Sequence, residues 1–473
     1  MGRLSYVAGA VMGAMTLPEL RPAELPDPKP LRKVIGPGVI AAGVGLASGE
    51  FVIWPYISAN VGLVFLWAAV VGVVAQYFLN MEIERYTLAT GETALTGFSR
   101  LGRHWGLAFA AMAVLANIWP GWATSSATVL TYAVGGDVTV IAVVELLLIA
   151  VALTLSPVVY RTMEATQFLK VGAVLVFLVI ALFLAITGDA YRGLGEAVTH
   201  AGQVPAQLGA ALVLGAMAFA GAGGGQNLVQ SNWIRDKNMG MGERIPRLVS
   251  PITGEDQAVP ATGFAFTADE ANLARWRGWW RVANIEQLVS FVAITIVTIS
   301  LMSMLAYSTV FGAGTASDVT FLRTEGEVLN QRLSWFGTFF WAVGALSLFA
   351  ASMGICDYVA RMVADVVKTV YLPASTRWTE SRVYSLVVWF IVLFGIAMLT
   401  IGFDQPITLL VISASVGGIM MFLYSALLAV LNRRLLPEAI RIRGYRLVIV
   451  LLTFAFFGYF SVLTLIDQFG KLF

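Results

Sequence analysis

The chain has 473 residues and a formal net charge of +2; 58% of the residues are hydrophobic, 12% are charged, and the mean hydropathy is +0.80. Soluble domains carry about 25% charged residues, so this composition excludes a soluble globular protein and indicates a membrane protein with many spans. The single cysteine, Cys356, excludes an internal disulfide framework, and the two histidines, His104 and His200, argue against a His/Cys zinc site.

Residues 1–33 are predicted to form a cytoplasmic N-terminal arm. The apolar patch Val7–Leu17 is too short to span a bilayer, and the proline-rich run Leu17–Pro30 predicts extended backbone. Beyond the arm, apolar stretches follow one another with short polar links. We therefore predict one transmembrane domain over residues 34–473.

Apolar stretches long enough to span a membrane number eleven, which predicts an all-α polytopic membrane protein. They are residues 34–59, 62–83, 105–134, 138–157, 166–187, 206–233, 280–308, 333–356, 383–403, 406–431 and 446–466.

The basic residues follow the alternation that eleven spans require, because lysine and arginine concentrate in cytoplasmic links. With the N-terminus in the cytoplasm and the C-terminus outside, all but four of the 30 basic residues are assigned to cytoplasmic links; the four are Arg192, Arg323, Arg332 and Lys471. This distribution predicts an integral protein of the plasma (inner) membrane, in contact with lipid. It gives no sign of a nucleic-acid partner.

The first span contains an unusual run, Gly43–Pro55, in which three glycines surround one carboxylate, Glu50. An unpaired charge inside hydrocarbon costs several kcal/mol, so an intramembrane carboxylate indicates a functional site. A break of the helix near Glu50 would place this charge in the protein interior.

In the third span, the run Asn117–Trp122 contains a proline, Pro120, that would kink the helix and shape a cavity wall.

The sixth span, like the first, combines glycines with polar residues inside an apolar stretch. It contains Gly221, Gly223, Gly224 and Gly225, followed by a polar stretch that begins at Gln226. Each glycine lowers helix stability by about 1 kcal/mol relative to alanine, so this helix is predicted to break and to face the protein interior.

The link that precedes the seventh span, Ile234–Arg281, ends in a piece with Trp276, Trp279 and Trp280 at the membrane edge. This pattern predicts an amphipathic helix anchored at the interface by its tryptophans.

The two breaks open two sets of five spans in opposite orientation, which is typical of transporters with inverted repeats and a binding site at the membrane midplane. Repeat one covers about residues 34–187, repeat two about 206–431, and an extra helix about 446–466. The alternative is that the glycines only permit close helix packing, although packing alone leaves Glu50, Gln226 and Asn227 unexplained.

At these residues the chain resembles the Nramp family of proton-coupled divalent-metal transporters. The residues that carry the resemblance are Gly36–Gly38, Ala47–Glu50, Gly91–Thr93 and Gln226–Leu228. The resemblance implies a LeuT-like fold with a 5+5 inverted repeat, discontinuous helices 1 and 6, and eleven transmembrane helices.

The chain departs from the family at the metal site. The family's Asp-Pro-Gly-Asn aligns with Ala47, Ser48, Gly49 and Glu50, so the metal-binding aspartate is missing and a carboxylate replaces the asparagine. The family's Met-Pro-His aligns with Gly224, Gly225 and Gln226, which removes the thioether and the imidazole. Oxygen donors remain, and these suit a hard cation.

The substrate-binding residues predicted from both breaks are Ala47, Ser48, Gly49, Glu50, Gly221, Gly224, Gly225, Gln226 and Asn227. Among them, Glu50, Gln226 and Asn227 are the predicted metal ligands. We expect a secondary transporter that moves a hard, divalent cation such as Mg²⁺ or Mn²⁺ by alternating access, without a cofactor.

Two other functions stay open. The first is transport of a small organic solute, with Glu50 pairing an amine and Trp54, Trp119 or Trp122 offering aromatic surface. The second is a receptor or scaffold that transports nothing. An enzyme is not indicated, because the spans contain no nucleophile, His-x-x-x-His or P-loop motif.

Further intramembrane carboxylates separate into two groups. Glu82, Glu84 and Asp357 are predicted to pair with Arg85 and Arg361 at the interface. Glu145 has no basic neighbour in sequence, so it is either an interior hydrogen-bonded group or, like Glu50, a candidate for ion coupling.

Overall fold

The structure is a computed structural model that describes residues 17–254, 262–312, 319–402 and 406–470; the side chains of Ser48, 406–410 and 467–470 lie outside this description. Apart from Leu17, the predicted patch Val7–Leu17 also lies outside it, as does Lys471.

Helices account for the predicted spans. Nine helical segments of the described residues are long and apolar enough to cross a membrane. Helix α5 (Trp67–Thr90) and the interrupted pair α12 (Ala210–Ala218) and α13 (Gly225–Asp236) bring the total to the eleven that we predicted. From Gln76 onward, α5 carries the polar side chains Gln76, Asn80, Glu82 and Glu84, which are buried in the protein.

The predicted first repeat, about residues 34–187, contains the elements from α3 to α10. Its elements are α3 (Pro37–Gly45), the π-helical turn η1 (Ser48–Ile53), α4 (Trp54–Val61), α5, α7 (Trp105–Asn117), α8 (Gly121–Val134), α9 (Val138–Leu155) and α10 (Val159–Leu184).

The predicted second repeat, about residues 206–431, contains the elements from α12 to α19. Its elements are α12, α13, α14 (Glu270–Glu286), η3 (Gln287–Ala293), α15 (Ile294–Val310), α17 (Phe336–Val366), η4 (Val367–Tyr371), α18 (Glu380–Thr400) and α19 (Pro406–Arg434), after which α20 (Tyr445–Gly470) is the extra helix.

Short elements occupy the links. They are β1 (Arg21–Pro22), α2 (Leu31–Val34), α6 (Ala94–Leu101), α11 (Gly188–Thr199), η2 (Gly240–Arg244), β2 (Phe264–Ala265), α16 (Phe321–Arg332) and η5 (Glu438–Ile440).

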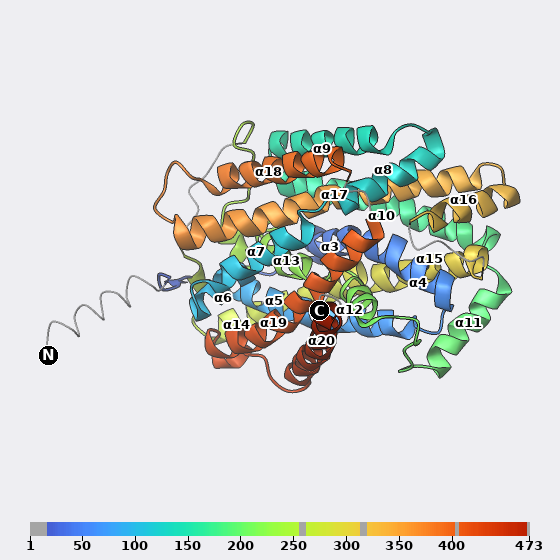
Figure 1. Ribbon diagram of the computed structural model, residues 1–473. Helices are drawn as coiled ribbons and strands as arrows, with labels where there is room; N and C mark the ends of the chain where they lie inside the picture. The colour runs from blue at the N-terminus through green and yellow to red at the C-terminus, as the bar shows by residue number, and fades with distance from the viewer. Residues whose placement is uncertain (1–16, 255–261, 313–318, 403–405, 471–473) are drawn as a thin grey trace, which may run out of the picture.

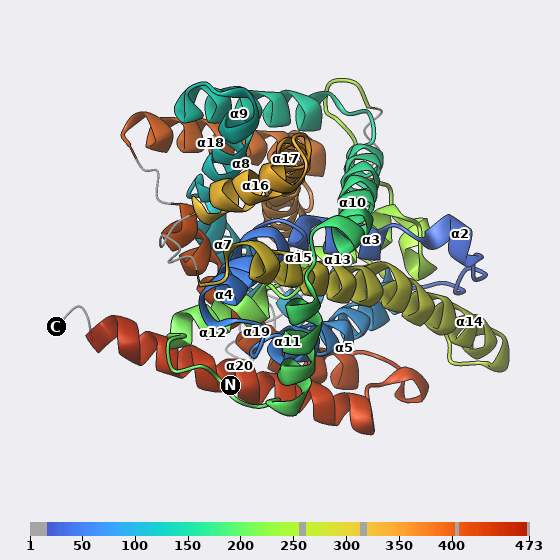
Figure 2. The same cartoon turned by 90° about the vertical axis from the view of Figure 1, so that its right-hand side faces the viewer.

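The broken helices lie at the centre of the molecule. Figures 1 and 2 show α9 and α18 together at one edge and α20 at the opposite edge, with α3, α4 and α13 between them. Helix α15 packs along α4, and α13 packs against α5. All residues of α3 and most residues of α4 are buried. Neighbouring helices therefore surround this apolar segment, which a lipid-facing helix would expose on one side.

Backbone geometry explains why helix 6 breaks where it does. Gly221, Gly223 and Gly224 have φ angles of 109°, 64° and 54°, in the left-handed region that glycine alone adopts without a steric cost. In helix 1, α3 ends at Gly45, and Ala47 has a non-helical backbone before the π-helical turn begins. The predicted discontinuities of helices 1 and 6 are confirmed.

The N-terminal arm is fixed to the link before α14. Arg21 and Pro22 pair in parallel with Phe264 and Ala265. Further along the arm, the backbone N–H of Leu25 donates to Asn272 Oδ1 at 3.0 Å. The extended backbone predicted for this segment therefore belongs to a two-stranded contact rather than to a free tail.

The predicted interfacial helix is part of a longer one. Helix α14 continues through η3 into α15 as one helical segment, Glu270–Val310, of 41 residues. Trp276 and Trp279 are buried, and Trp279 Nε1 donates to the carbonyl of Pro26 in the arm at 2.8 Å. The prediction of an interfacial anchor was wrong for these two tryptophans, because both are buried within the protein: Trp279 bonds to the arm, and Trp276 stacks on Phe266 of the link.

Candidate functional site

The two helix breaks touch each other. A Cβ atom on Gly45 would lie 2.2 Å from the carbonyl oxygen of Gly221, and one on Gly49 would lie 2.0 Å from that of Phe219. Both distances are far below van der Waals contact, so the backbones meet only because these positions are glycine.

A small cavity lies between the breaks and the kinked third span. It has room for about one water molecule in this conformation. It is lined by Val44, Gly45, Gly49, Asn117, Trp122, Phe219, Gly221, Ala222, Gln226, Ile355 and Ser413. No charged side chain is among these residues, so the lining is apolar with three neutral polar groups.

The predicted kink of the third span shapes the cavity wall. Helix α7 ends at Asn117 and α8 begins at Gly121. Trp122 Nε1 donates to the Asn117 carbonyl at 3.1 Å, and Ser413 Oγ donates to Asn117 Oδ1 at 3.2 Å. These bonds hold Trp122 and Ser413, two lining residues, in place.

Of the nine predicted substrate-binding residues, Gly49, Gly221 and Gln226 line the cavity. Gly224 packs on the backbone of Gly417, and Gly225 packs on Tyr358. Ala47 is buried in the helix 1 break without lining the cavity. The side chain of Ser48 lies outside the described residues.

The two predicted amide ligands have different surroundings. Gln226 is 6% exposed, and its Oε1 accepts no hydrogen bond from the described residues. Asn227 instead donates to Asn80 Oδ1 at 2.6 Å and accepts from the Tyr424 hydroxyl at 3.0 Å. Gln226 thus offers a free acceptor at the cavity, whereas the side chain of Asn227 is engaged in helix packing.

Glu50 is fully buried but does not line the cavity. Its Oε2 accepts a hydrogen bond from Thr298 Oγ1 of α15, and its Oε1 has no hydrogen-bond partner among the described residues. Glu50, Gln226 and Asn227 therefore do not face a common cavity in this conformation. The described residues also contain no group of three or more His, Cys, Asp or Glu side chains that could hold a metal.

Lys170 is a buried charged residue beside the helix 1 break that the sequence analysis missed, because we assigned it to a cytoplasmic link. It lies within α10 and is fully buried. Its ammonium donates to the carbonyl of Gly43 at 2.5 Å, beside the helix 1 break, and it lies within electrostatic range of Glu50. Its position four residues inside the fifth predicted span was the available signal.

Glu145 lies at a helix interface away from the cavity. Ser126 Oγ donates to Glu145 Oε1 at 3.0 Å, and Oε2 has no partner among the described residues. An interior hydrogen bond is thus present, and a role in ion coupling stays a prediction.

The breaks are braced by a side chain from α5. Gln76 Nε2 donates to the carbonyls of Ala218 and Ala220 at 2.9 Å each, and Gln76 Oε1 accepts from the Gly223 N–H at 2.9 Å. One amide side chain therefore satisfies three backbone groups that the break of helix 6 leaves without helical partners.

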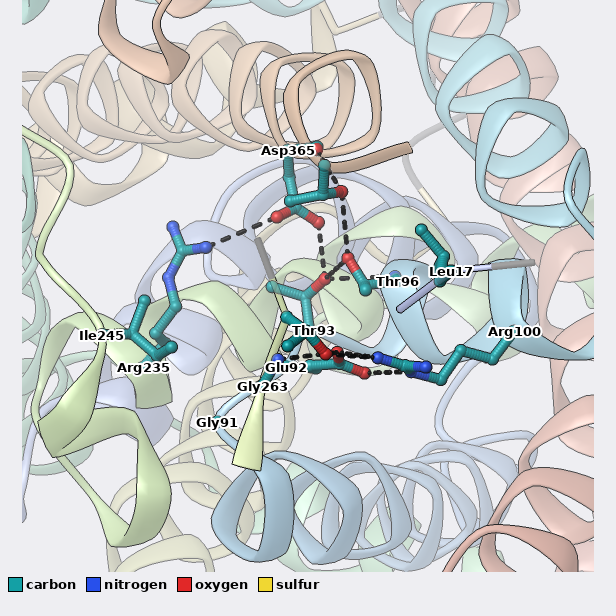
Figure 3. A pocket seen from close by; sticks show the side chains of 12 residues that line it. Leu17, Gly91, Glu92, Thr93, Thr96, Arg100, Arg235, Ile245, Gly263 and Asp365 are labelled. Atoms are coloured by element: carbon teal, nitrogen blue, oxygen red, sulfur yellow. Dashed lines mark hydrogen bonds and ion pairs between the residues drawn. The ribbon is translucent and has the colours of Figure 1, made fainter. Parts of the chain in front are cut away.

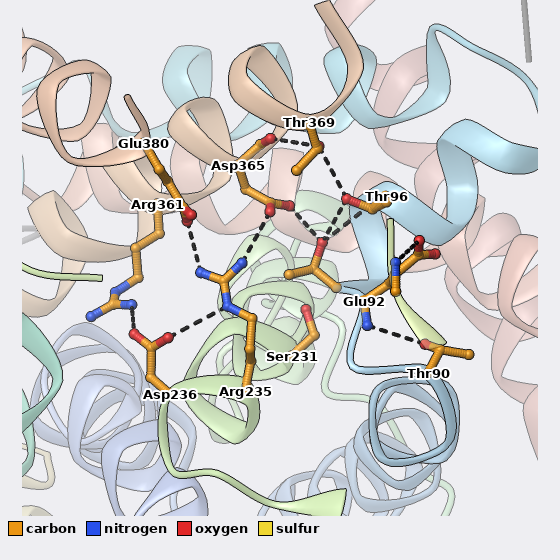
Figure 4. A network of polar contacts seen from close by, with 12 residues as sticks. Thr90, Glu92, Thr96, Ser231, Arg235, Asp236, Arg361, Asp365, Thr369 and Glu380 are labelled. Atoms are coloured by element: carbon orange, nitrogen blue, oxygen red, sulfur yellow. Dashed lines mark hydrogen bonds and ion pairs between the residues drawn. The ribbon is translucent and has the colours of Figure 1, made fainter. Parts of the chain in front are cut away.

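A charged network closes the predicted cytoplasmic side (Figure 4). Arg235 of α13 binds Glu380 at 2.7 Å and Asp365 at 3.4 Å. Arg361 binds Asp236 at 2.5 Å and Asp357 at 2.9 Å. The network joins broken helix 6 to α17 and α18.

A pocket at the end of this network contains the Gly91–Thr93 motif. Figure 3 shows Glu92 and Arg100 at one end of this pocket and Asp365 at the other, with Thr93 and Thr96 between them. Glu92 accepts from Arg100 Nε at 2.7 Å and from the backbone N–H of Gly263 at 2.9 Å. This motif thus links the end of α5 to the residue that precedes strand β2.

The interface pairs were predicted correctly for two of three carboxylates. Glu82 pairs with Arg85 at 2.6 Å, and Asp357 pairs with Arg361. Glu84 forms no ion pair within the described parts of the chain; its Oε1 accepts from Gln230 and Gln287. The prediction for Glu84 was wrong, because its neighbour Arg85 is already bound to Glu82.

Comparisons with known proteins agree on the fold. No protein-family model matches the chain, and no curated protein matches its sequence. Among solved structures, a mutant of the Eremococcus coleocola manganese transporter is 13% identical, covers 92% of this chain and 86% of its own, and gives a TM-score of 0.68. The same transporter in complex with an aromatic bis-isothiourea substituted compound gives a TM-score of 0.65.

A second transporter has a related structure. Mhp1, a nucleobase-cation-symport-1 family transporter, was solved in a closed conformation with bromovinylhydantoin bound; it is 13% identical, with 93% and 92% of the two chains covered and a TM-score of 0.54. The manganese transporter is of the Nramp family, and both proteins have the LeuT fold. The resemblance to the Nramp family therefore holds at the level of the fold, and the chain is an all-α integral membrane protein with the LeuT-type architecture of these transporters.

Proposed function

We propose that the protein is a secondary transporter that works by alternating access around the cavity between helices 1 and 6. The observation that carries this proposal is the direct meeting of two broken helices at a closed central cavity. Freed backbone groups and small residues at such breaks form the binding sites of transporters with inverted repeats. The fold shared with the manganese transporter and Mhp1 supports it.

The lining favours a small organic solute with N–H donors. Gln226 Oε1 is a buried acceptor without a partner among the described residues, and leaving such an atom unpaired costs about 1–3 kcal/mol. Trp122 and Phe219 add apolar surface. A solute that donates to Gln226 and packs on Trp122 would remove this cost. Since the cavity now has room for about one water molecule, entry requires the helices to separate.

A hard cation is the second candidate. The small cavity and the oxygen of Gln226 favour it, and one similar structure is named a manganese transporter. The absence of a carboxylate from the described lining argues against a divalent ion, because protein sites for Mg²⁺ and Ca²⁺ use carboxylates. Glu50 would have to turn towards the cavity from Thr298 to serve as a ligand.

Isothermal titration of the purified protein distinguishes the two substrates. We would titrate Mg²⁺, Mn²⁺ and Ca²⁺ alongside a panel of small amines and amides, using wild type, Gln226→Leu, Glu50→Gln and the exposed control Gln331→Leu. An organic substrate should bind wild type and Gln331→Leu, and bind Gln226→Leu about tenfold more weakly, which corresponds to ~1.4 kcal/mol.

Binding of a divalent cation that Glu50→Gln abolishes would instead select the cation. Uptake of the binding solute into proteoliposomes then tests transport itself. A solute that binds but never accumulates under any ion gradient would contradict the transporter proposal and favour a receptor.

A further inference from the structure

Two buried carboxylates meet at the predicted cytoplasmic half of the molecule, away from the central cavity. Glu84 of α5 and Glu286 of α14 are both fully buried. Gln287 Nε2 donates to Glu84 Oε1 at 3.0 Å and to Glu286 Oε2 at 3.1 Å. One amide nitrogen therefore bridges the two groups, and their oxygens lie no farther apart than two hydrogen-bond lengths.

Of the two carboxylates, Glu286 has the surroundings that better stabilise a negative charge. Glu286 Oε1 accepts the backbone N–H groups of Gly36 at 3.1 Å and Gly38 at 2.9 Å. These groups belong to the N-terminal end of α3, the first half of broken helix 1. Unpaired N–H groups and the helix dipole at this end stabilise a negative charge.

The surroundings of Glu84 favour its protonated form. Its Oε1 accepts from two neutral amides, Gln230 at 2.9 Å and Gln287, while its fully buried Oε2 accepts nothing from the described residues. A second buried negative charge beside Glu286 would suffer like-charge repulsion in addition to its own desolvation.

Basic residues do not neutralise the pair. Within the described parts of the chain, neither Glu84 nor Glu286 forms an ion pair; Arg85 and Arg446 bind Glu82, and Lys237 binds Glu164. The titratable and polar groups around the two carboxylates are Tyr77 and Asn80 of α5, Tyr160 of α10, Gln230 of α13, and Gln287 and Ser290 of η3. The carboxylates Glu164 and Asp236 lie within electrostatic range of Tyr160.

We propose that Glu84 and Glu286 form a proton-binding dyad that holds one proton, carried by Glu84, and that this proton is linked to the position of helix 1. When the first half of helix 1 moves away, Glu286 loses the N–H groups of Gly36 and Gly38 and competes for the proton. Two interacting carboxyl groups then take up and release the proton as a pair. Resting on the proposed function, this inference assigns the two side chains that would carry a coupled proton.

Infrared difference spectroscopy tests the dyad without any transport substrate. At neutral pH, Glu84→Gln should lose one protonated-carboxyl carbonyl band relative to wild type, whereas Glu286→Gln should keep it. The exposed carboxylate Glu327, paired with Arg323 on α16, provides the control Glu327→Gln, which should leave the band unchanged. Glutamine keeps the acceptor oxygen at each position, and Glu84→Asp, which should retain a shifted band, serves if Glu84→Gln does not fold.

If well-folded Glu84→Gln keeps every protonated-carboxyl band of wild type, the proposal is overturned. So would a wild-type band that appears only when sodium is removed, because sodium rather than a proton would then occupy the dyad.

Proteoliposomes show whether the dyad couples transport. Glu84→Gln should keep solute exchange while losing the acceleration that a proton gradient gives wild type. If wild type moves no solute, the proposed function fails while the infrared result still decides the dyad. If Glu84→Gln loses the band yet remains driven by the proton gradient, coupling through the dyad is overturned.

Discussion

At the scale of single residues, the buried pair Glu50 and Lys170 is the clearest departure from an apolar membrane interior. Both side chains are fully buried. Glu50 accepts a hydrogen bond from Thr298, and Lys170 donates one to the carbonyl of Gly43. Glu50→Gln or Lys170→Met alone would remove the electrostatic attraction between the two groups, so each single variant should unfold at a lower temperature than wild type. The double variant should therefore be more stable than the sum of the two losses predicts.

Thermal unfolding of the four proteins in detergent gives this coupling directly. Additive losses from the two single variants would show that Glu50 and Lys170 do not compensate each other.

Glycines at the helix 6 break provide a second residue-scale prediction. A Cβ on Gly223 would lie 2.2 Å from the Ala218 carbonyl oxygen, and one on Gly224 would lie 2.6 Å from Gly417 Cα, with φ positive at both positions. Gly223→Ala or Gly224→Ala should lower the free energy of unfolding by about 2 kcal/mol or more. Gly172→Ala, where a Cβ would meet nothing within 4 Å, should be neutral or stabilising in the same melting experiment. Equal effects at all three positions would contradict the strained geometry.

Glu325, in the link helix α16 outside the spans, gives a pH dependence. Burial raises the pKa of Glu325 from 4.5 to about 8, although a hydrogen bond from Thr309 opposes the shift. The folded protein thus binds more protons than the unfolded chain between these values. Proton binding by Glu325 therefore stabilises the folded protein. The stabilisation is present in full below about pH 4.5 and is lost as the pH rises through about 8.

Melting temperatures of wild type and Glu325→Gln from pH 5 to pH 9 measure this loss. The stability of wild type relative to the variant should fall as the pH rises. A constant difference across the range would contradict the assignment.

Residue chemistry was only partly predictable from the sequence. The burial of Glu50 followed from its apolar flanks, but the direction of its side chain did not, because both sides of helix 1 are covered by other helices. Lys170 was missed because counting basic residues by topology places a lysine near a span end in the link. Glu84 was misassigned since its neighbour in sequence, Arg85, is engaged by Glu82 three residues before it.

At the scale of elements, the break of helix 6 depends on a side chain from α5. Gln76→Leu would leave the Ala218 and Ala220 carbonyls and the Gly223 N–H buried without their present partner. Each orphaned group costs about 1–3 kcal/mol, so Gln76→Leu should unfold at a clearly lower temperature than wild type and than the exposed control Gln331→Leu. Unchanged stability in Gln76→Leu would show that water replaces the amide.

Element boundaries were predictable where the end of an apolar stretch coincides with glycine or proline. Glycine runs and Pro120 marked the three interrupted spans, because these residues oppose a continuous helix. The burial of Trp279 was not visible in the sequence, since it depends on an arm more than 240 residues away in sequence.

At the scale of the whole molecule, two sets of contacts close the predicted cytoplasmic side. The network around Arg235 and Arg361 joins α13, α17 and α18, and Glu286 holds the start of α3. Both would have to open for the cavity to reach that side. The inverted-repeat architecture was predictable from matching positions of the two breaks, whereas these closing contacts join residues far apart in sequence and leave no local pattern.

Alternating access around the cavity is the central claim, and accessibility of one lining residue tests it without knowledge of the substrate. Ser413 lines the cavity, and Ser425 is buried on the same helix, α19, away from it. Ser413→Cys and Ser425→Cys would each be made in a Cys356→Ala background and treated with a membrane-impermeant thiol reagent from either side of sealed vesicles. Ser413→Cys should react from both sides and Ser425→Cys from neither; reaction of Ser413→Cys from one side only, or from none, would contradict alternating access at this cavity.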